Sequence, residues 1–402
     1  MRSGFDGPVV LKATATQIEF DLRHRGRLKK ALSIAFVPYW GSGNPYQDAL
    51  AEHLVAHGAT VRKVRSLKEL FRYGVCVDRD VDVVHLHWLL VFRWRGLRAL
   101  RCLAFVIRLL LLRMHGVRLV WTIHNLLPHE SRHPKLDWLL RRIVAGLSHA
   151  MIVHSETAKR QAMDMWRLKD ASRVTVVPHG HYMDDYRNDV SRQEARQRLS
   201  VDGSKIVLLF LGAVRPYKGI LDLVEAFKKL ADDDAYLVIA GKPLDHAFAE
   251  RIGRAISDVE QVRFDAGFVD DDDVQVYMNA SDVVILPYRH VLSSGAALLA
   301  MSFGKPCIAP AEGSLADVLD TSGAFLYDPE CEEGLLDAIQ RALGAKDALI
   351  RMGEHNRQRA SQWTWDNAAR MTLAVYERFL AGNGGGAAAG HNTATSERIP
   401  RS

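Results

Sequence analysis

Short runs of aliphatic and β-branched residues alternate along this chain with longer stretches in which apolar residues recur every three or four positions. The short runs predict buried strands, and the longer stretches predict amphipathic helices. Regular alternation of the two predicts parallel sheets joined by crossover helices. The expected fold class is therefore α/β.

The alternation begins near residue 31 and starts again near residue 205, where the apolar run IVLLFLG follows a polar stretch. The clearest helical pattern follows this run, because apolar residues recur at helical spacing over 220–230. Strands are expected at 32–37, 82–86, 117–123, 150–153, 174–177, 206–212, 236–240, 262–264, 283–286 and 307–309. Helices are expected at 45–57, 91–113, 136–146, 220–230, 296–303 and 363–379.

A chain of 402 residues is too long for one core, and the repeated pattern predicts two α/β domains. The polar segment 184–204, dense in Arg, Asp and Gln, is the expected linker. The expected parts are an N-terminal extension at 1–30, a first domain at 31–190, a second domain at 191–362, a helix at 363–380 that crosses back to the first domain, and a disordered tail at 381–402.

Composition excludes several classes of protein. With 48% apolar and 25% charged residues, the chain is neither collagen-like nor wholly disordered. Its four cysteines are widely separated and form no CxxC pair. This usage predicts a reducing compartment and no structural zinc site.

Charge is divided unevenly between the two halves. Residues 1–200 hold 33 Lys and Arg against 18 Asp and Glu, giving +15, whereas residues 201–402 hold 20 against 29, giving −9. A basic half suits an anionic partner, either nucleic acid or a membrane surface. Because no helix-turn-helix, RNP or zinc-finger pattern is present, the membrane is favoured and nucleic acid is not expected.

The segment Val91–Val117 carries six arginines and no acidic residue around a Leu-rich body. As a helix, this pattern is typical of a basic amphipathic element on a membrane surface. A core-packed helix with an arginine-rich outer face would show the same pattern. No run of 18 apolar residues and no secretory signal is found, so we expect a cytoplasmic protein associated peripherally with the inner face of the cell membrane.

Polar residues follow the expected strands of the first half, where ligands bind in parallel sheets. The first strand leads into a glycine-containing turn with Gly43 and Asn44, whose backbone could approach a phosphate or sugar. Later strands end in His85 and His87, and in His124 and Asn125, with Glu130 shortly after. We expect these groups to bind hydroxyls and to include one general base, with at least one of His85 and His124 purely structural. Metal binding is not favoured, because no HExxH or cysteine partner is present.

The second half shows two candidate phosphate-binding turns. Arg215 and Lys218 lie three residues apart between a strand and the helix 220–230, a position that suits a pyrophosphate. Further along the chain, Tyr288 and the group Ser293, Ser294 and Gly295 precede the helix 296–303. Free backbone N–H groups at that helix start suit a second phosphate oxygen.

These segments resemble glycosyltransferases of the GT-B fold, in which two Rossmann-like domains face each other across a cleft. The resemblance is carried by GAVRPYKGILDLVEAF at 212–227, DVVILPY at 282–288, SSGAALLAMSFGKPCIA at 293–309 and EGSLADVLDTSGAFLYDP at 312–329. Within that fold, GNPY at 43–46, HLHW at 85–88, TIHNLLPHE at 122–130 and HGHY at 179–182 are similar to GDP-mannose:glycolipid 4-beta-mannosyltransferases. These enzymes extend lipid-linked oligosaccharides for bacterial exopolysaccharide.

The resemblance implies a first domain that binds a lipid-linked glycan acceptor and a second that binds a nucleotide sugar, with no metal or other cofactor. The donor most favoured is GDP-mannose; a UDP-sugar transferase for glucose or glucuronic acid, or an inactive nucleotide-sugar-binding protein, remains an alternative. Arg215, Lys218, Ser294 and Gly295 would hold the donor phosphates, and Gly43, Asn44, His124, Asn125, Tyr288 and Ser293 would contribute to donor or acceptor binding.

One departure from the family pattern bears on mechanism. Retaining GT-B enzymes carry two glutamates around the helix 296–303, and the matching positions here are Val291 and Leu299. An inverting reaction, with a general base in the first domain, is therefore expected. The candidates for that base are Glu130, then His87, then Asp48.

Overall fold

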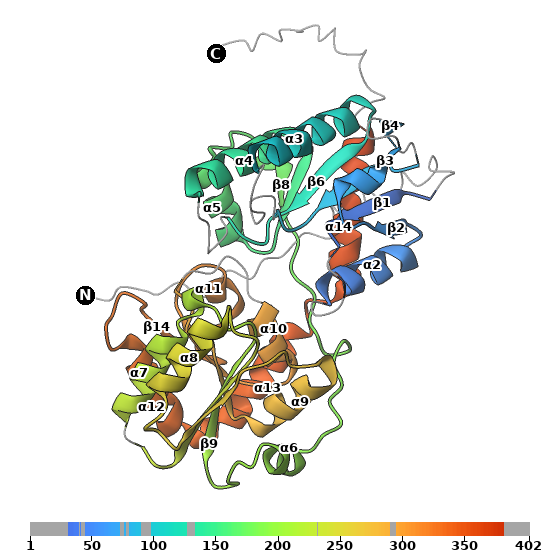
Figure 1. Cartoon of the computed structure of the whole chain (residues 1–402). Coiled ribbons are helices and arrows are strands. Elements are labelled where there is room, and N and C mark those ends of the chain that lie inside the picture. Colours follow the sequence, from blue (N-terminus) through green and yellow to red (C-terminus); the bar gives the residue numbers. More distant parts are fainter. Residues whose placement is uncertain are drawn as a thin grey trace, which may run out of the picture.

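The computed structural model describes residues 31–39, 41, 45–72, 76–77, 80–89, 98–126, 133–230, 232–289 and 295–381. These residues form two six-stranded sheets with interleaved helices, one above the other in Figure 1. The expected α/β class with two Rossmann-like sheets is confirmed. None of the helices in these ranges is long and apolar enough to cross a bilayer.

The first sheet has the strand order β2-β1-β5-β6-β7-β8, and every neighbouring pair is parallel. Its four central strands, β1, β5, β6 and β7, are mostly apolar and almost entirely buried, as expected where helices cover both faces. The strands are β1 (Ser33–Val37), β2 (Thr60–Lys63), β5 (Val83–Leu86), β6 (Arg118–Thr122), β7 (Ala150–Val153) and β8 (Val174–Val176). The helices are α2 (Tyr46–Ala56), α3 (Arg98–Met114), α4 (Pro134–Leu147) and α5 (Glu156–Trp166), and a small antiparallel pair is formed by β3 (Phe71–Arg72) and β4 (Cys76–Val77).

The second sheet has the order β11-β10-β9-β12-β13-β14 and is also parallel throughout, which is the strand order of the Rossmann fold. Its strands are β9 (Ile206–Leu211), β10 (Ala235–Ala240), β11 (Val262–Asp265), β12 (Val283–Ile285), β13 (Cys307–Pro310) and β14 (Ala324–Tyr327). Its helices are α7 (Ile220–Leu230), α8 (His246–Ala255), α9 (Asp271–Ala280), α10 (Gly295–Ser302), α11 (Leu315–Val318), α12 (Gly334–Gly344) and α13 (Leu349–Ala360).

One strand of each six-stranded sheet is missing from the expected strands, as are both strands of the small pair β3–β4. β2 is an edge strand in which Arg62 and Lys63 occupy two of the four positions, so it shows no buried run. β14 is the opposite edge of the second sheet and has only four residues. Helix α3 begins at Arg98, and the earlier part of the expected helix 91–113 lies outside the described residues.

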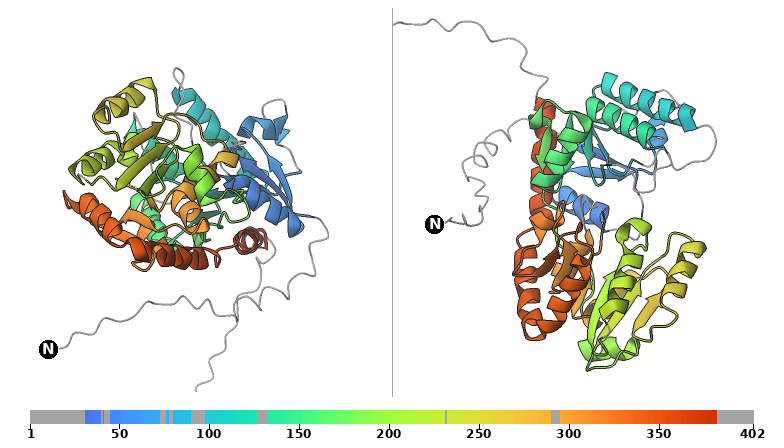
Figure 2. Two further views of the ribbon diagram at one scale, coloured as in Figure 1. Left: turned by 90° about the horizontal axis from the view of Figure 1, so that it is seen from below. Right: turned by 90° about the vertical axis from the view of Figure 1, so that its left-hand side faces the viewer.

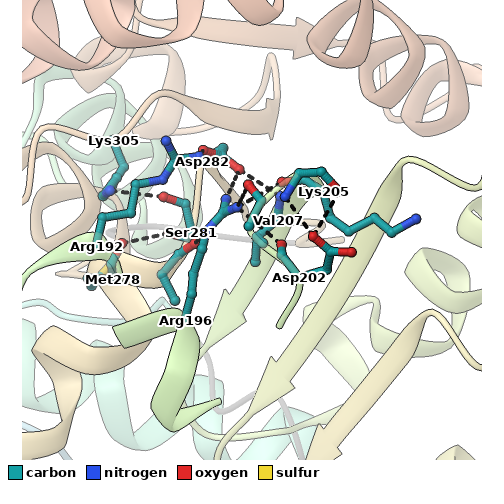
Figure 3. Close-up of polar contacts among 12 residues, drawn as sticks. Arg192, Arg196, Asp202, Lys205, Val207, Met278, Ser281, Asp282 and Lys305 are labelled. Atoms are coloured by element: carbon teal, nitrogen blue, oxygen red, sulfur yellow. Dashed lines mark hydrogen bonds and ion pairs between the residues drawn. The ribbon is translucent and has the colours of Figure 1, made fainter. Parts of the chain in front are cut away.

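The polar segment 184–204 contains a helix, α6 (Arg192–Arg198), in place of a plain linker. The Arg196 side chain is only 5% exposed and forms an ion pair with Asp282 at 2.6 Å (Figure 3). Its guanidinium also donates to the carbonyls of Ala280 at 3.1 Å and Gly203 at 2.7 Å. Arg196 therefore attaches α6 to the amino end of the second sheet. The many charged residues of this segment, taken alone, suggest only a solvent-exposed linker.

The last described helix, α14 (Trp365–Ala381), returns to the first half and packs on α2, β6 and β7. It is the red helix beside the first sheet in Figure 2. At its start, the Trp365 ring lies so close to Gly180 that a side chain at that glycine would overlap the indole. Near its end, the Tyr376 hydroxyl is 2.6 Å from Nδ1 of His85 in the core. The chain thus crosses between the two halves twice, near Gly180 and near Trp365.

Candidate active site

The carboxyl ends of the two sheets meet. Thr157, at the start of α5, donates its N–H and its hydroxyl to the Asp317 carboxylate of α11, at 3.1 and 3.0 Å. Strand order reverses between β1 and β5 in the first sheet and between β9 and β12 in the second. Open α/β sheets bind ligands outside the carboxyl ends of their strands at such switch points, so the candidate site lies where these ends of the two sheets face each other.

Glycines allow the loops of the second sheet to approach one another closely. Gly241 has φ +147°, and a Cβ atom there would overlap the carbonyl of Gly212. Gly219 has φ +68°, and a Cβ atom there would overlap the carbonyl of Pro287. The loops after β9, β10 and β12 are therefore held together at the switch point.

Arg215 and Lys218 lie at this switch point. They occupy the expected turn between a strand, β9, and the helix α7. The Lys218 ammonium lies 5.4 Å from the ring centre of Tyr288 and 5.7 Å from that of Phe210. Desolvation, followed by repulsion from Arg215, lowers the Lys218 pKa to about 8. Within the described part of the chain, Lys218 has no carboxylate partner, so a bound anion would find its charge uncompensated.

Helix α10 begins at Gly295, beside Tyr182 of the other half. A Cβ atom on Gly295 would lie 3.2 Å from the Tyr182 hydroxyl. The backbone N–H of Tyr182 also donates to the Ser302 hydroxyl of α10 at 2.9 Å. Ser293 and Ser294, expected to bind the donor, lie outside the described residues, as does Val291. Helix α10 is thus close to Tyr182 at its first residue and hydrogen-bonded to it at its last residue, Ser302.

Four histidines, one after each of four successive strands, line the side of the candidate site that the first sheet forms. His87, His124, His154 and His179 follow β5, β6, β7 and β8 and surround the ring of Tyr46, with ring centres 4.8–5.8 Å from it. Burial lowers the pKa of each, to about 4 for His154 and about 3 for His179, so these rings are neutral at pH 7. We call these four histidines and Tyr46 the histidine wall.

Hydrogen bonds indicate which ring nitrogens carry protons. Nδ1 of His179 donates to the carbonyl of Gly180 at 2.7 Å, so its Nε2 accepts from the Tyr182 hydroxyl at 3.2 Å. Nδ1 of His154 donates to the carbonyl of Val177 at 2.9 Å, and His87 lies 3.4 Å from His124 through Nδ1 and Nε2. The wall thus presents neutral hydrogen-bonding groups, which suit hydroxyls better than phosphates.

His85 is structural, as expected of at least one histidine here. It is fully buried, and its Nε2 lies 2.6 Å from the Thr122 hydroxyl while Nδ1 contacts Tyr376. Both ring nitrogens are therefore occupied. Burial lowers the His85 pKa to about 3 and keeps the ring neutral.

The structure describes two more of the expected site residues, Asp48 and Asn125. Asp48, on α2, accepts the Tyr39 hydroxyl at 3.0 Å and pairs with Lys63. Asn125 is partly exposed next to His124. Gly43, Asn44 and Glu130 lie outside the described residues. In the part of the chain that the structure describes, no cluster of His, Cys, Asp or Glu is arranged to hold a metal ion.

Tyr46, Trp88, His154, His179 and Tyr182 were not assigned a role from the sequence. The sequence carries a signal for three of these residues, because Trp88, His154 and His179 follow expected strands just as His87 and His124 do. Tyr182 could not be found in this way, since its position depends on how the second half docks. Convergence on Tyr46 is a tertiary property that strand ends alone do not reveal.

Two family models match the chain, one in each half. Residues 205–345 match "Glycosyl transferases group 1", and residues 50–184 match "Glycosyltransferase Family 4". The first match contains Arg215, Lys218 and α10, and the second contains the histidine wall except Tyr46. Both sides of the site thus lie within glycosyltransferase sequences.

Among curated relatives, a GDP-mannose:glycolipid 4-beta-D-mannosyltransferase of Xanthomonas campestris pv. campestris is 29% identical over 273 residues, which are 65% of this chain and 72% of that protein. A D-inositol 3-phosphate glycosyltransferase of Corynebacterium aurimucosum is 27% identical over 331 residues, covering 76% of this chain and 74% of that protein.

Solved structures share the fold. Sucrose-phosphate synthase from Thermosynechococcus elongatus superposes with a TM-score of 0.70 at 19% identity, over 88% of this chain and all of that one. HepE of Anabaena, in complex with UDP-glucose, superposes with a TM-score of 0.65 at 16% identity, over 86% of this chain and all of that one. The expected resemblance is confirmed: this chain is an enzyme that belongs to the glycosyltransferases of the GT-B fold.

Proposed function

We propose that this glycosyltransferase moves mannose from GDP-mannose to a lipid-linked glycan, with inversion, in polysaccharide biosynthesis at the inner face of the cell membrane. The donor is proposed because the Xanthomonas relative, which is 29% identical, is a GDP-mannose-dependent mannosyltransferase. The lipid-linked acceptor is proposed from a surface of this chain. That surface is the single structural observation that carries the proposal.

An apolar surface is formed by the neighbouring helices α3 and α4 (Figure 1). On α3 it contains Leu100, Leu103, Ile107, Leu110 and Met114, and on α4 it contains Leu136, Leu139 and Ile143, all of them exposed. Only four other large apolar side chains of the described chain are exposed. Such a patch marks a binding surface, because water-soluble surfaces rarely gather so many large apolar groups. We call it the α3–α4 face.

Cationic side chains flank the α3–α4 face. Arg101 and Arg113 are exposed on α3, and Lys135 and Arg142 are exposed on α4. α3 has no acidic residue, and Asp137 of α4 is 2% exposed and paired with Arg141. Apolar groups rimmed by cations fit the interface of an anionic bilayer, where the acceptor's lipid would be held.

The donor side supplies groups for an anionic leaving group. We propose that Arg215, Lys218 and the start of α10 hold the donor diphosphate, which is supported by the position of the Lys218 ammonium beside the Tyr288 ring after β12. In the proposed reaction the acceptor oxygen forms a bond to the sugar C1 as the bond from C1 to the diphosphate oxygen breaks. These cations and N–H groups stabilise the charge that develops on the diphosphate.

Inversion is proposed because Leu299, on α10, stands where a retaining enzyme of this group carries a glutamate, as does Val291 outside the described residues. In-line attack then requires a base for the acceptor hydroxyl proton. Glu130 remains our first candidate. His87 is 1% exposed and Asp48 already binds Tyr39 and Lys63, which makes both less available to an acceptor.

To test this proposal, the purified full chain is incubated with radiolabelled GDP-mannose, UDP-glucose or UDP-glucuronate in separate reactions. Octyl glycosides of glucose, mannose and glucuronic acid serve as stand-in acceptors. We expect transfer from GDP-mannose, and a β-mannoside by NMR, because the donor sugar is α-linked. Transfer only from a uridine donor would show that the proposed donor, GDP-mannose, is wrong. An α-mannoside product would contradict inversion. Nucleotide binding without transfer from any donor would favour the inactive binding protein.

The same assay tests the base. Glu130→Ala should abolish transfer while leaving the dissociation constant for GDP unchanged, because the carboxylate acts only on the acceptor. Unchanged transfer would eliminate Glu130 and move the assignment to His87 or Asp48.

A further inference from the structure

Trp88 occupies the ligand-binding position of the first sheet. It follows His87 directly at the end of β5, where the strand order reverses between β1 and β5. It is partly exposed, although it packs against the main core. A large, partly exposed aromatic side chain at a switch point is a typical element of a binding site.

The buried side of the Trp88 indole is fixed by His124. Their rings are stacked with centres 4.2 Å apart and an angle of 14° between planes. His124 is 8% exposed, and the edge of Tyr46 meets it at 4.8 Å and 90°. Burial holds the His124 pKa well below its usual value, so the stack is between two neutral rings. Trp88 is thus a rigid plate supported by the histidine wall.

We propose that Trp88 is the platform on which a sugar ring of the acceptor stacks. The C–H face of a pyranose would lie on the open part of the indole, and the hydroxyls at its rim would meet the neutral wall. Placement favours the acceptor over the donor, because the phosphate-binding cations stand on the second sheet and Trp88 on the first. This inference rests on the proposed glycosyl transfer but not on the identity of the donor sugar.

The kinetic test compares Trp88→Leu with Trp363→Leu in transfer to the octyl glycosides, using whichever donor the wild type accepts. Trp363 is a partly exposed indole that lies against Arg359, outside the candidate site, and is the matched control. Trp88→Leu should raise the acceptor KM about tenfold, because the variant loses the free energy of one aromatic contact with the sugar and of the apolar area that this contact buries. The dissociation constant for GDP should not change. An unchanged KM would overturn the proposal.

A second measurement separates this inference from the proposed function. The indole N–H signal of Trp88 is identified in ¹⁵N-tryptophan spectra of the full chain by its loss in Trp88→Leu. Octyl glycosides should shift this signal, and GDP should not. A shift in a protein that transfers no mannose would retain the platform and reject the donor; glycoside binding that leaves the signal in place would reject the platform whatever the donor.

Discussion

The Tyr376 hydroxyl lies 2.6 Å from Nδ1 of His85, although 291 residues separate them in the sequence. This contact joins α14 to the central strand β5 in a place without access to water, since both residues are 0% exposed. The last helix is therefore part of the first half's core.

Tyr376→Phe should lower the free energy of unfolding by about 1–3 kcal/mol, because Nδ1 of the buried His85 would lose its partner. Urea unfolding of the full chain measures the change. Tyr236→Phe is the control, because the described structure gives the Tyr236 hydroxyl no hydrogen bond and its side chain is only partly buried. Equal stability of the two variants would contradict the role of this contact.

Arg196→Met should destabilise the chain by about 1–3 kcal/mol, because it removes one of the two arginine partners of Asp282 and takes this donor from the carbonyls of Ala280 and Gly203. Arg198→Met is the matched control on the same helix. Arg198 pairs with Glu194 on the exposed surface, so its loss should change stability by less than about 1 kcal/mol. Chemical denaturation of both variants tests the prediction, and similar losses would contradict a special role for Arg196.

Donor affinity should decrease as the pH rises through about 8. The pKa of Lys218 is lowered to about 8, so its ammonium is charged below that pH and loses its proton above it. Since the charged form attracts the diphosphate, the dissociation constant for GDP should rise between neutral and alkaline pH. Calorimetric titration of GDP across this range measures the effect.

Two substitutions at Lys218 complete this experiment. Lys218→Met should weaken GDP binding about tenfold to a hundredfold, the value of a charge-assisted hydrogen bond. Lys218→Arg keeps its charge at alkaline pH and should remove the decrease in affinity above pH 8. If Lys218→Met retained the wild-type pH profile, another group would be responsible.

The α3–α4 face should bind vesicles of phosphatidylcholine and phosphatidylglycerol, and bind phosphatidylcholine alone more weakly. Leu103→Ser with Ile107→Ser should reduce binding to the anionic vesicles by about tenfold or more, because two large apolar side chains no longer enter the interface. Cosedimentation measures the bound fraction. Ile350→Ser is the control, since Ile350 is 72% exposed on α13 of the other half.

Charge and salt should affect this binding in the same direction. Arg101→Glu with Arg113→Glu should abolish the preference for anionic vesicles, and high salt should weaken wild-type binding. If neither the apolar nor the cationic substitutions changed the fraction of protein bound to vesicles, the α3–α4 face would not be the membrane contact.

The periodicity of the sequence predicts α7 from Ile220 to Leu230 with the bounds that the structure gives, because its apolar stripe is unbroken. Patterns also place Arg215 and Lys218 in one turn, since they are close in sequence. What they do not reveal depends on contacts over long distances in the chain. The approach of Tyr182 to Gly295 and the stacking of Trp88 on His124 both require the folded arrangement of strand ends.

Thermal unfolding of the purified full chain with GDP, GDP-mannose, UDP, UDP-glucose and UDP-glucuronate measures directly which nucleotide sugar the protein binds. A ligand at 100 times its dissociation constant adds about 2.7 kcal/mol to stability, enough to move the melting temperature measurably. We expect GDP and GDP-mannose to raise the melting temperature and the uridine compounds to change it little. Stabilisation by a uridine nucleotide alone would contradict the proposed donor.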